Sequence, residues 1–167
     1  MRIIPFLFIT FATIYSQNGF IKTAEDKFFL NNREFKFIGF NAYYLQSEAG
    51  KTNRRYIVED VFQSAKSIGV NVIRTWAFYE SFSFSNPSVI RKSPYEIQEP
   101  GLIALDYVLN KARENGIYLI LTLSNNYSAF GGIPQYLEWA NRSQINGSRN
   151  HVHNDFFSSD SIKQWFK

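Results

Sequence analysis

The chain has 167 residues, enough for one domain, and its 17 Phe, 10 Tyr and 3 Trp provide apolar area for a core. It has no cysteine, which excludes a disulfide framework and a cysteine-ligated metal site. The formal net charge is +4, but the basic residues are scattered, and Lys51, Arg54 and Arg55 form the densest group. Nucleic-acid binding needs a basic stripe on one face, so a solvated helix entry explains this group better.

The first 16 residues, MRIIPFLFITFATIYS, run from a basic residue through an apolar stretch to small residues. This order is typical of a secretory signal peptide. The apolar stretch is shorter than the roughly 20 residues that a transmembrane helix needs. We therefore expect cleavage near Ser16, a secreted, extracellular chain over residues 17–167, and no membrane partner. Three sequons, at Asn126, Asn141 and Asn146, could then carry glycans.

Strands and amphipathic helices alternate along the middle of the chain. FKFIGFN (35–41) is predicted to be the first strand. Gly69 and Gly116 each follow a run of apolar residues at helical spacing, as expected at helix C-termini. The apolar positions are Ile57, Val58, Val61, Phe62, Ala65 and Ile68 in the first helix, and Leu102, Leu105, Val108, Leu109 and Ala112 in the second.

A strand is predicted after each of these glycines. The first reads VNVIRTWAFY (70–79), and the second, IYLILTLSNN (117–126), is almost continuously apolar over 117–123. Such a run suits a parallel strand that is covered on both faces. The order strand, helix, strand, helix, strand predicts a parallel α/β protein.

Arg74 and Trp76 share one face of the strand that begins at Val70, because successive side chains in a strand point to opposite sides. An arginine in an apolar strand needs a carboxylate or equivalent partner, since burying an unpaired charge is costly. An ionised partner would have a lowered pKa. The pattern alone supports two interpretations of Trp76 equally: an aromatic ring that stacks on a ligand, and a large core residue.

The end of the chain offers no cofactor site. His151 and His153 lie in a polar stretch, NRSQINGSRNHVHND (141–155), and are interpreted as solvated loop residues rather than metal ligands. The glycines never show G-x-G-x-x-G spacing, so no phosphate-binding loop is predicted. We expect no metal and no cofactor. SIKQWFK (161–167) is predicted to lie in an amphipathic helix that Ser159 or Asp160 opens.

The residues that follow the predicted strands suit a sugar ligand. In parallel α/β folds, ligands meet the C-terminal ends of the strands. Asn side chains supply neutral donors and acceptors for hydroxyls, and an aromatic plate suits the C–H face of a pyranose. The strand-end residues are Asn41, Tyr43, Tyr44, Arg74, Trp76, Phe78, Glu80, Ser124, Asn125, Asn126 and Tyr127, followed by Gly131 and Gly132.

Five segments together resemble the secreted endo-β-1,4-mannanases of glycoside hydrolase family 5, in that family's order and over nearly all of the chain after residue 16. The combination of RTWAF, a strand that ends in Asn-Asn, and GG-x-PQY is the most specific part. The segments are FKFIGFNAYYL (35–45), SIGVNVIRTWAF (67–78), ALDYVLNKARENGIYLILTLSNNY (104–127), GGIPQYLEWA (131–140) and NDFFSSDSIKQWFK (154–167).

The resemblance implies a (β/α)8 TIM barrel, a mannan-type polysaccharide substrate and a monomeric full-length enzyme. It implies that Trp76 lines the sugar-binding cleft and that Arg74 lies beneath it, against the nucleophilic glutamate. Asn41, Tyr43 and Asn125 would lie on the cleft floor. The chain departs from the pattern at Tyr127, where such mannanases often have Trp.

The chain lacks the catalytic glutamates that the resemblance implies. A retaining glycosidase needs two carboxylates about 5 Å apart. In this family one glutamate stands in an Asn-Glu-Pro context after the fourth strand and the other follows the seventh. Here Glu99 alone precedes a proline, but it follows Gln98 and comes before a helix, whereas Glu80 follows a strand with no evident partner.

A full barrel takes roughly 250 residues, and this chain supplies about three strand–helix units. We therefore expect the N-terminal part of a longer enzyme, inactive and unstable on its own. Two alternatives stay open: a related barrel hydrolase that cleaves another β-glucan, and a secreted carbohydrate-binding remnant without catalysis.

Overall fold

The computed structural model describes residues 20–81, 85–140 and 149–166. The expected signal peptide (1–16) and the sequons at Asn141 and Asn146 lie outside the described residues. The chain divides into two compact units, residues up to Lys36 and residues from Phe37 onward. In the first unit, β1 (Lys22–Ala24), β2 (Lys27–Leu30) and β3 (Arg33–Glu34) form an antiparallel sheet in sequence order, which the sequence analysis did not predict.

A three-stranded parallel sheet is the centre of the second unit. Its strands are β4 (Gly39–Asn41), β5 (Val72–Trp76) and β8 (Tyr118–Thr122), in the order β4-β5-β8. The prediction of parallel strands is thus confirmed, although the strands are shorter than predicted. The register aligns Asn41 with Arg74, and Arg74 with Ile120, across the sheet.

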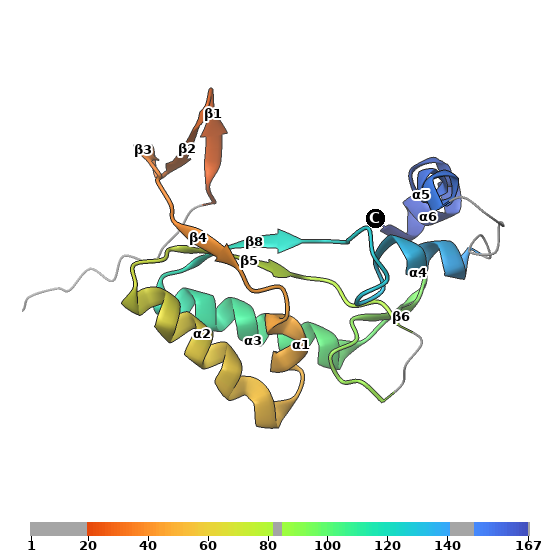
Figure 1. Ribbon diagram of the computed structural model, residues 1–167, viewed down its shortest axis with the longest axis horizontal. Helices are drawn as coiled ribbons and strands as arrows, with labels where there is room; N and C mark the ends of the chain where they lie inside the picture. Colours follow the sequence, from red (N-terminus) through yellow and green to blue (C-terminus); the bar gives the residue numbers. More distant parts are fainter. Residues whose placement is uncertain (1–19, 82–84, 141–148, 167) are drawn as a thin grey trace, which may run out of the picture. The chain divides into compact units, whose positions relative to one another are not determined.

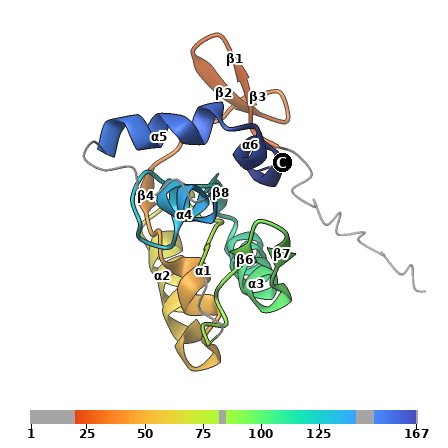
Figure 2. The same cartoon turned by 90° about the vertical axis from the view of Figure 1, so that its right-hand side faces the viewer.

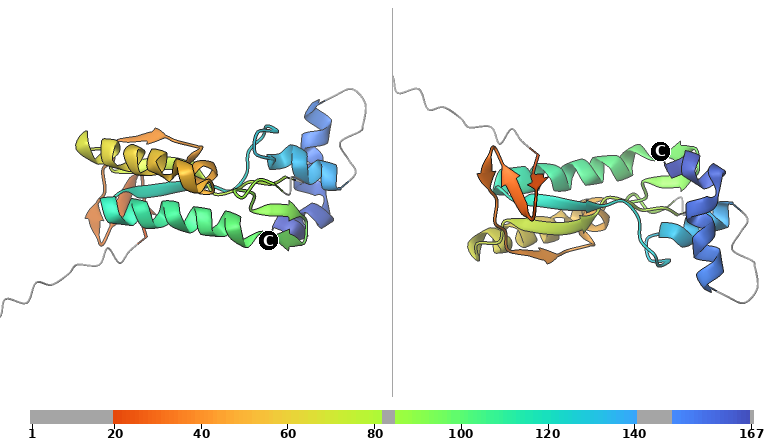
Figure 3. Two further views of the ribbon diagram at one scale, coloured as in Figure 1. Left: turned by 90° about the horizontal axis from the view of Figure 1, so that it is seen from below. Right: turned by 90° about the horizontal axis from the view of Figure 1, so that it is seen from above.

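Helices cover one face of this sheet. They are α1 (Leu45–Ala49), a short 3-10 helix η1 (Thr52–Arg54), α2 (Arg55–Ser67) and α3 (Glu99–Asn115). Ile73 of β5 is fully buried against Phe62 of α2 and Val108 of α3 in one apolar core. Figures 1 and 3 show α2 and α3 running side by side along the sheet. Gly69 and Gly116 have φ values of +79° and +69°, which confirms the predicted glycine turns after both helices.

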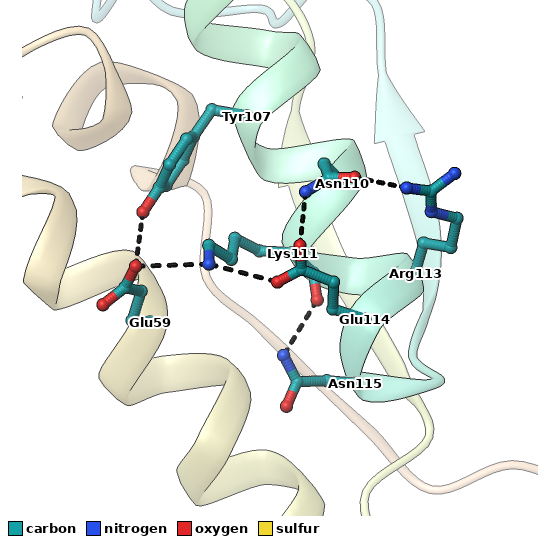
Figure 4. A network of polar contacts seen from close by, with 7 residues as sticks. All are labelled: Glu59, Tyr107, Asn110, Lys111, Arg113, Glu114 and Asn115. Carbon is teal, nitrogen blue, oxygen red and sulfur yellow. Dashed lines mark hydrogen bonds and ion pairs between the residues drawn. The ribbon is translucent and has the colours of Figure 1, made fainter.

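A polar network also joins α2 to α3 (Figure 4). The hydroxyl of Tyr107 donates to Glu59 Oε1 at 2.7 Å, and Lys111 Nζ lies 3.3 Å from the same oxygen. The hydrogen bond from Tyr107 and the charge and hydrogen bond of Lys111 lower the pKa of the Glu59 carboxyl. Arg55 of α2 stacks over the Tyr107 ring, with its guanidinium carbon 4.5 Å from the ring centroid. The two helices are therefore held together at their polar rim as well as in their core.

Buried polar contacts attach α1 to the segment that precedes α3 and to the first turn of α3 itself. Gln46 is 1% exposed, and its side-chain amide donates to the carbonyls of Ser88 at 2.7 Å and Gly101 at 3.1 Å. Ser88 in turn donates through Oγ to the Ser47 carbonyl at 2.7 Å. The same segment continues into a small hairpin of β6 (Arg91–Ser93) and β7 (Glu96–Ile97). These contacts fix the path of the chain between β5 and α3.

Three helices gather at the C-terminal side of the second unit (Figure 2): α4 (Gly132–Trp139), α5 (Arg149–Ser158) and α6 (Asp160–Phe166). Ile133, Tyr136, Leu137 and Ile162 form their core. The predicted final helix is confirmed, and it begins directly after Ser159. The loop prediction for His151 and His153 is wrong, because both lie in α5. Within α5, Phe156 packs on Tyr136 of α4, and this contact joins α5 to the core of the three helices. Among the described residues, no helix is long and apolar enough to cross a membrane.

Candidate functional site

The candidate site lies at the C-terminal ends of β4, β5 and β8. Because the three strands are parallel, these ends share one edge of the sheet. The loops that leave this edge lead to α1, to the β6–β7 hairpin and to α4. All five predicted site residues, Asn41, Tyr43, Arg74, Trp76 and Asn125, lie in these strand ends or in the loops that follow them.

Asn41 and Arg74 form a direct pair on the sheet face opposite the helices. Arg74 Nη1 donates to Asn41 Oδ1 at 3.0 Å, and both residues are exposed. Ile120, next in the same row, is 49% exposed. The expected partner of Arg74, a carboxylate or its equivalent, is in the described residues the Asn41 amide. Within the part of the chain that the structure describes, Arg74 lies on an open face and is satisfied by an amide.

An aromatic cluster surrounds Trp76 at the end of β5. Its ring centroid lies 4.8 Å from that of Tyr43, 5.0 Å from that of Phe78 and 5.0 Å from that of Phe130. The indole is half-buried, and its Nε1 atom is buried without a hydrogen-bond partner among the described residues. Ring packing, rather than hydrogen bonding, therefore fixes the orientation of Trp76.

Asn125 builds the loop between β8 and α4. Its side-chain amide donates to the Ala129 carbonyl at 2.9 Å, and its Oδ1 accepts the Tyr127 N–H at 2.6 Å. Its own carbonyl accepts the Ile133 N–H at 2.9 Å, at the start of α4. The Asn125 side chain thus shapes the loop, and the loop leaves the Tyr127 ring 75% exposed.

Glu80 is a buried acid in the loop that follows β5, and it has partners that the sequence did not reveal. It is 4% exposed; its Oε2 accepts the Gly132 N–H at 3.0 Å, and its Oε1 lies 3.5 Å from the donating hydroxyl of Tyr136. Burial raises the pKa of the Glu80 carboxyl to about 7, against the opposing effects of the Gly132 N–H and the Arg91 charge. Burial and the neighbouring Glu80 carboxylate raise the pKa of Tyr136, so its phenol stays a donor.

Phe130 is the member of the site that sequence reasoning missed. It is a non-glycine residue at φ +62°, directly before Gly131 and Gly132, which also have positive φ values of +96° and +63°. The Gly-Gly pair was a local sign of an unusual turn. Nothing local indicated that the preceding aromatic ring would contact Trp76, which lies far away in sequence.

Parallel strand–helix units with amide, guanidinium and aromatic groups at the strand ends fit part of a (β/α) barrel. Comparison with known proteins identifies the family. Residues 18–166 match the family described as GH family 5 beta-mannosidase-like. The chain belongs to this family, which confirms the family resemblance and the predicted fold class, a (β/α)8 barrel of which about three strand–helix units are present.

The relatives are named mannan endo-1,4-beta-mannosidases. Mannan endo-1,4-beta-mannosidase 5 of Solanum lycopersicum is 37% identical over 154 residues, which cover 91% of this chain and 35% of that protein. Mannan endo-1,4-beta-mannosidase 7 of Arabidopsis thaliana is 37% identical over 149 residues, covering 89% and 33%. The chain therefore spans about a third of the length of these relatives.

Two solved mannanase structures have a fold similar to that of this chain. The endo-1,4-beta-mannanase from Rhizomucor miehei superposes with a TM-score of 0.73 at 28% identity, over 88% of this chain and 39% of that one. The endo-beta-1,4-mannanase from Thermotoga petrophila gives a TM-score of 0.68 at 31% identity, over 81% and 29%.

Proposed function

We propose that this chain forms part of the catalytic barrel of a secreted, retaining glycosidase that cleaves internal β-1,4-mannosidic linkages in mannans. Family membership and the names of the relatives support this substrate class. The observation that carries the proposal is the meeting of the Asn41–Arg74 pair and the Trp76 cluster at one edge of a parallel sheet. The apolar, small-residue pattern of residues 1–16 supports secretion.

Retention proceeds in two displacements. One carboxylic acid gives its proton to the glycosidic oxygen as the bond from that oxygen to the anomeric carbon breaks, and a second carboxylate bonds to that carbon. Water then displaces the second carboxylate and returns a proton to the first. In this proposal the Arg74 guanidinium lies beside the second carboxylate and keeps it ionised, while Trp76 stacks on a sugar ring. The reaction as written uses no metal or cofactor.

The 167-residue chain alone is proposed to be inactive. Glu80 is the acid at the described strand ends, and its side chain is buried under the 125–133 loop, out of reach of a substrate. Among the described residues, β4 and β8 each have one unpaired edge, and Ile120 and Leu123 are 49% and 62% exposed. Open edges and exposed apolar groups favour association over stable folding.

The first test is the transcript sequence downstream of Lys167. An open frame with Asn-Glu-Pro after a fourth strand, and a later strand-end glutamate, would supply the carboxylate pair. The encoded full-length protein should then hydrolyse mannohexaose and leave cellohexaose intact, and NMR should show β-anomers as the first products. Cleavage of cellohexaose alone would indicate a β-glucan hydrolase, and binding without cleavage would indicate a carbohydrate-binding protein. Either result contradicts the proposal.

Secretion is tested separately. Mass spectrometry of the protein in the culture medium should find an N-terminus close to residue 17. A cell-associated protein that retains Met1 would refute secretion and leave the enzymatic proposal standing.

A further inference from the structure

Phe130 contacts the rings that surround the end of β5. Its ring centroid lies 5.0 Å from that of Trp76 with the planes at 80°, and 6.2 Å from that of Tyr43 with the planes at 84°. Edge-to-face packing of this kind is the arrangement that aromatic pairs favour, because the positive ring edge meets the negative ring face. The ring of Tyr79, in the segment after β5, also contacts Phe130, with the two centroids 4.7 Å apart. Phe130 thus lies between the Trp76 indole and the segment that follows β5.

The backbone at Phe130 is held in a conformation that it would not adopt by itself. Its φ of +62° lies in the left-handed region, which non-glycine residues rarely occupy. Such conformations persist only where the surrounding structure enforces them, and they gather at functional sites. The two glycines that follow, also at positive φ, allow the chain to turn sharply into α4. The turn therefore presents the Phe130 ring to Trp76 at a conformational cost.

Glu80 holds this turn through both its backbone and its side chain. The Glu80 N–H donates to the Phe130 carbonyl at 2.9 Å, and the Gly132 N–H donates to Glu80 Oε2 at 3.0 Å. Tyr136 donates to the other carboxyl oxygen at 3.5 Å. A Cβ at Gly131 would come within 2.6 Å of the Glu80 Cβ, so the turn is packed directly on this side chain. Glu80 thus grips the residues on both sides of Gly131.

We infer that Phe130 is a positioning residue for Trp76, and that Glu80 clamps the turn that carries Phe130. No hydrogen bond from Nε1 orients the indole among the described contacts, so its plane depends on its aromatic neighbours. Without the edge-to-face contact from Phe130, the Trp76 indole is free to tilt. A tilted indole loses contact with the face of the sugar ring. This inference rests on the proposed function, in which Trp76 stacks on substrate.

Kinetics of the full-length enzyme on mannohexaose test the inference. Phe130→Leu keeps an apolar side chain but removes the aromatic edge; it should raise KM roughly three- to tenfold, the range set by one edge-to-face contact, with kcat within about twofold. Phe130→Tyr keeps the edge and should restore KM. A matched control is Phe157→Leu, since Phe157 is 65% exposed on α5, away from the site. An unchanged KM in Phe130→Leu, or an equal rise in the control, overturns the positioning role.

A double-mutant cycle tests the clamp. Glu80→Ala should raise KM by a factor similar to that of Phe130→Leu, and the double variant should be little worse than the worse single one, because both changes act through one contact. If the KM increases of the two single variants multiply in the double variant, Glu80 acts independently of Phe130, and the clamp is overturned. Thermal melts of all variants identify unfolding as the cause of a lost rate. A wild-type enzyme that hydrolyses no mannan refutes the proposed function itself. An active enzyme whose KM does not change in Phe130→Leu refutes only the positioning role.

Discussion

Changing Glu80 to Gln should remove a pH dependence from the stability of the full-length protein. The Glu80 carboxyl is 4% exposed, and burial raises its pKa from 4.5 to about 7. Two groups that face it, the Gly132 N–H and the Tyr136 hydroxyl, oppose this rise as hydrogen-bond donors, and so does the charge of Arg91. Glutamine has a similar shape and an acceptor oxygen for the Gly132 N–H, but it does not ionise.

The direction in which the free energy of unfolding changes with pH depends on whether the folded or the unfolded protein binds the Glu80 proton more tightly. Between pH 4.5 and about 7 the folded protein retains the Glu80 proton while the unfolded chain releases it. The free energy of unfolding therefore falls as the pH rises through this range and levels off above it. A rise of this size in the pKa corresponds to roughly 3 kcal/mol lost between pH 4 and pH 8.

The assay compares melting temperatures of wild-type enzyme and Glu80→Gln at pH 4.5 and pH 8. Other titrating groups contribute equally to both proteins, so the relevant quantity is the change in their Tm difference. The advantage of the wild type should shrink by a few degrees at pH 8, because 1 kcal/mol corresponds to about 2–4 °C for 150–250 residues and to less for a longer protein. Glu138→Gln is the matched control, because Glu138 is exposed on α4 and its side chain bonds only Gln135 among the described contacts. A Tm difference that is constant with pH, or that shifts equally in the control, would refute this reasoning.

Three further predictions concern Trp76, the buried Gln46 and the isolated chain. In the full-length enzyme, Trp76→Ala should raise KM for mannohexaose about tenfold with little change in Tm, since the indole is half-buried; a matching loss of Tm would mean that Trp76 is mainly a core residue. Gln46→Leu should lower the stability by about 1–3 kcal/mol per orphaned carbonyl, because the Ser88 and Gly101 carbonyls lose their buried donor; Gln46→Glu, which also lacks the donor, should be no more stable, and a wild-type Tm in either variant contradicts this. The 167-residue chain alone should release no reducing sugar from galactomannan, and detectable hydrolysis by the purified chain would disprove its inactivity.

Local patterns were enough to predict the sheet and its helices. Apolar spacing located α2 and α3, and the glycines at 69 and 116 marked the turns where φ becomes positive. The alternation of side chains along β5 placed Arg74 and Trp76 on one face, opposite the fully buried Ile73 and Thr75. These features depend on neighbours a few residues away, and so the sequence expresses them directly.

The support of the site depends on contacts between distant segments, which a single sequence does not express. Glu80 and Gly132 are 52 positions apart, and their hydrogen bond gives the buried acid a partner that no local pattern indicated. Phe130, in its left-handed conformation, likewise accepts the N–H of Glu80, which is far away in sequence. The open position of Arg74 was missed for a related reason, because strand composition predicts burial on average and cannot separate the two faces of an incompletely covered sheet.

The two halves of the site are held by different forces, and this difference explains how a loop can control a strand residue. Asn41 and Arg74 lie on adjacent strands, so the sheet register alone brings their side chains together. Among the described residues, Trp76 at the end of β5 has no polar partner for its indole nitrogen, so ring contacts orient it, and the 125–133 loop supplies one of them through Phe130. That loop is closed at one end by Asn125, which accepts the Ile133 N–H, and is gripped near the other by Glu80. Residues that need not touch the substrate thus set the geometry of the one that is proposed to stack on it.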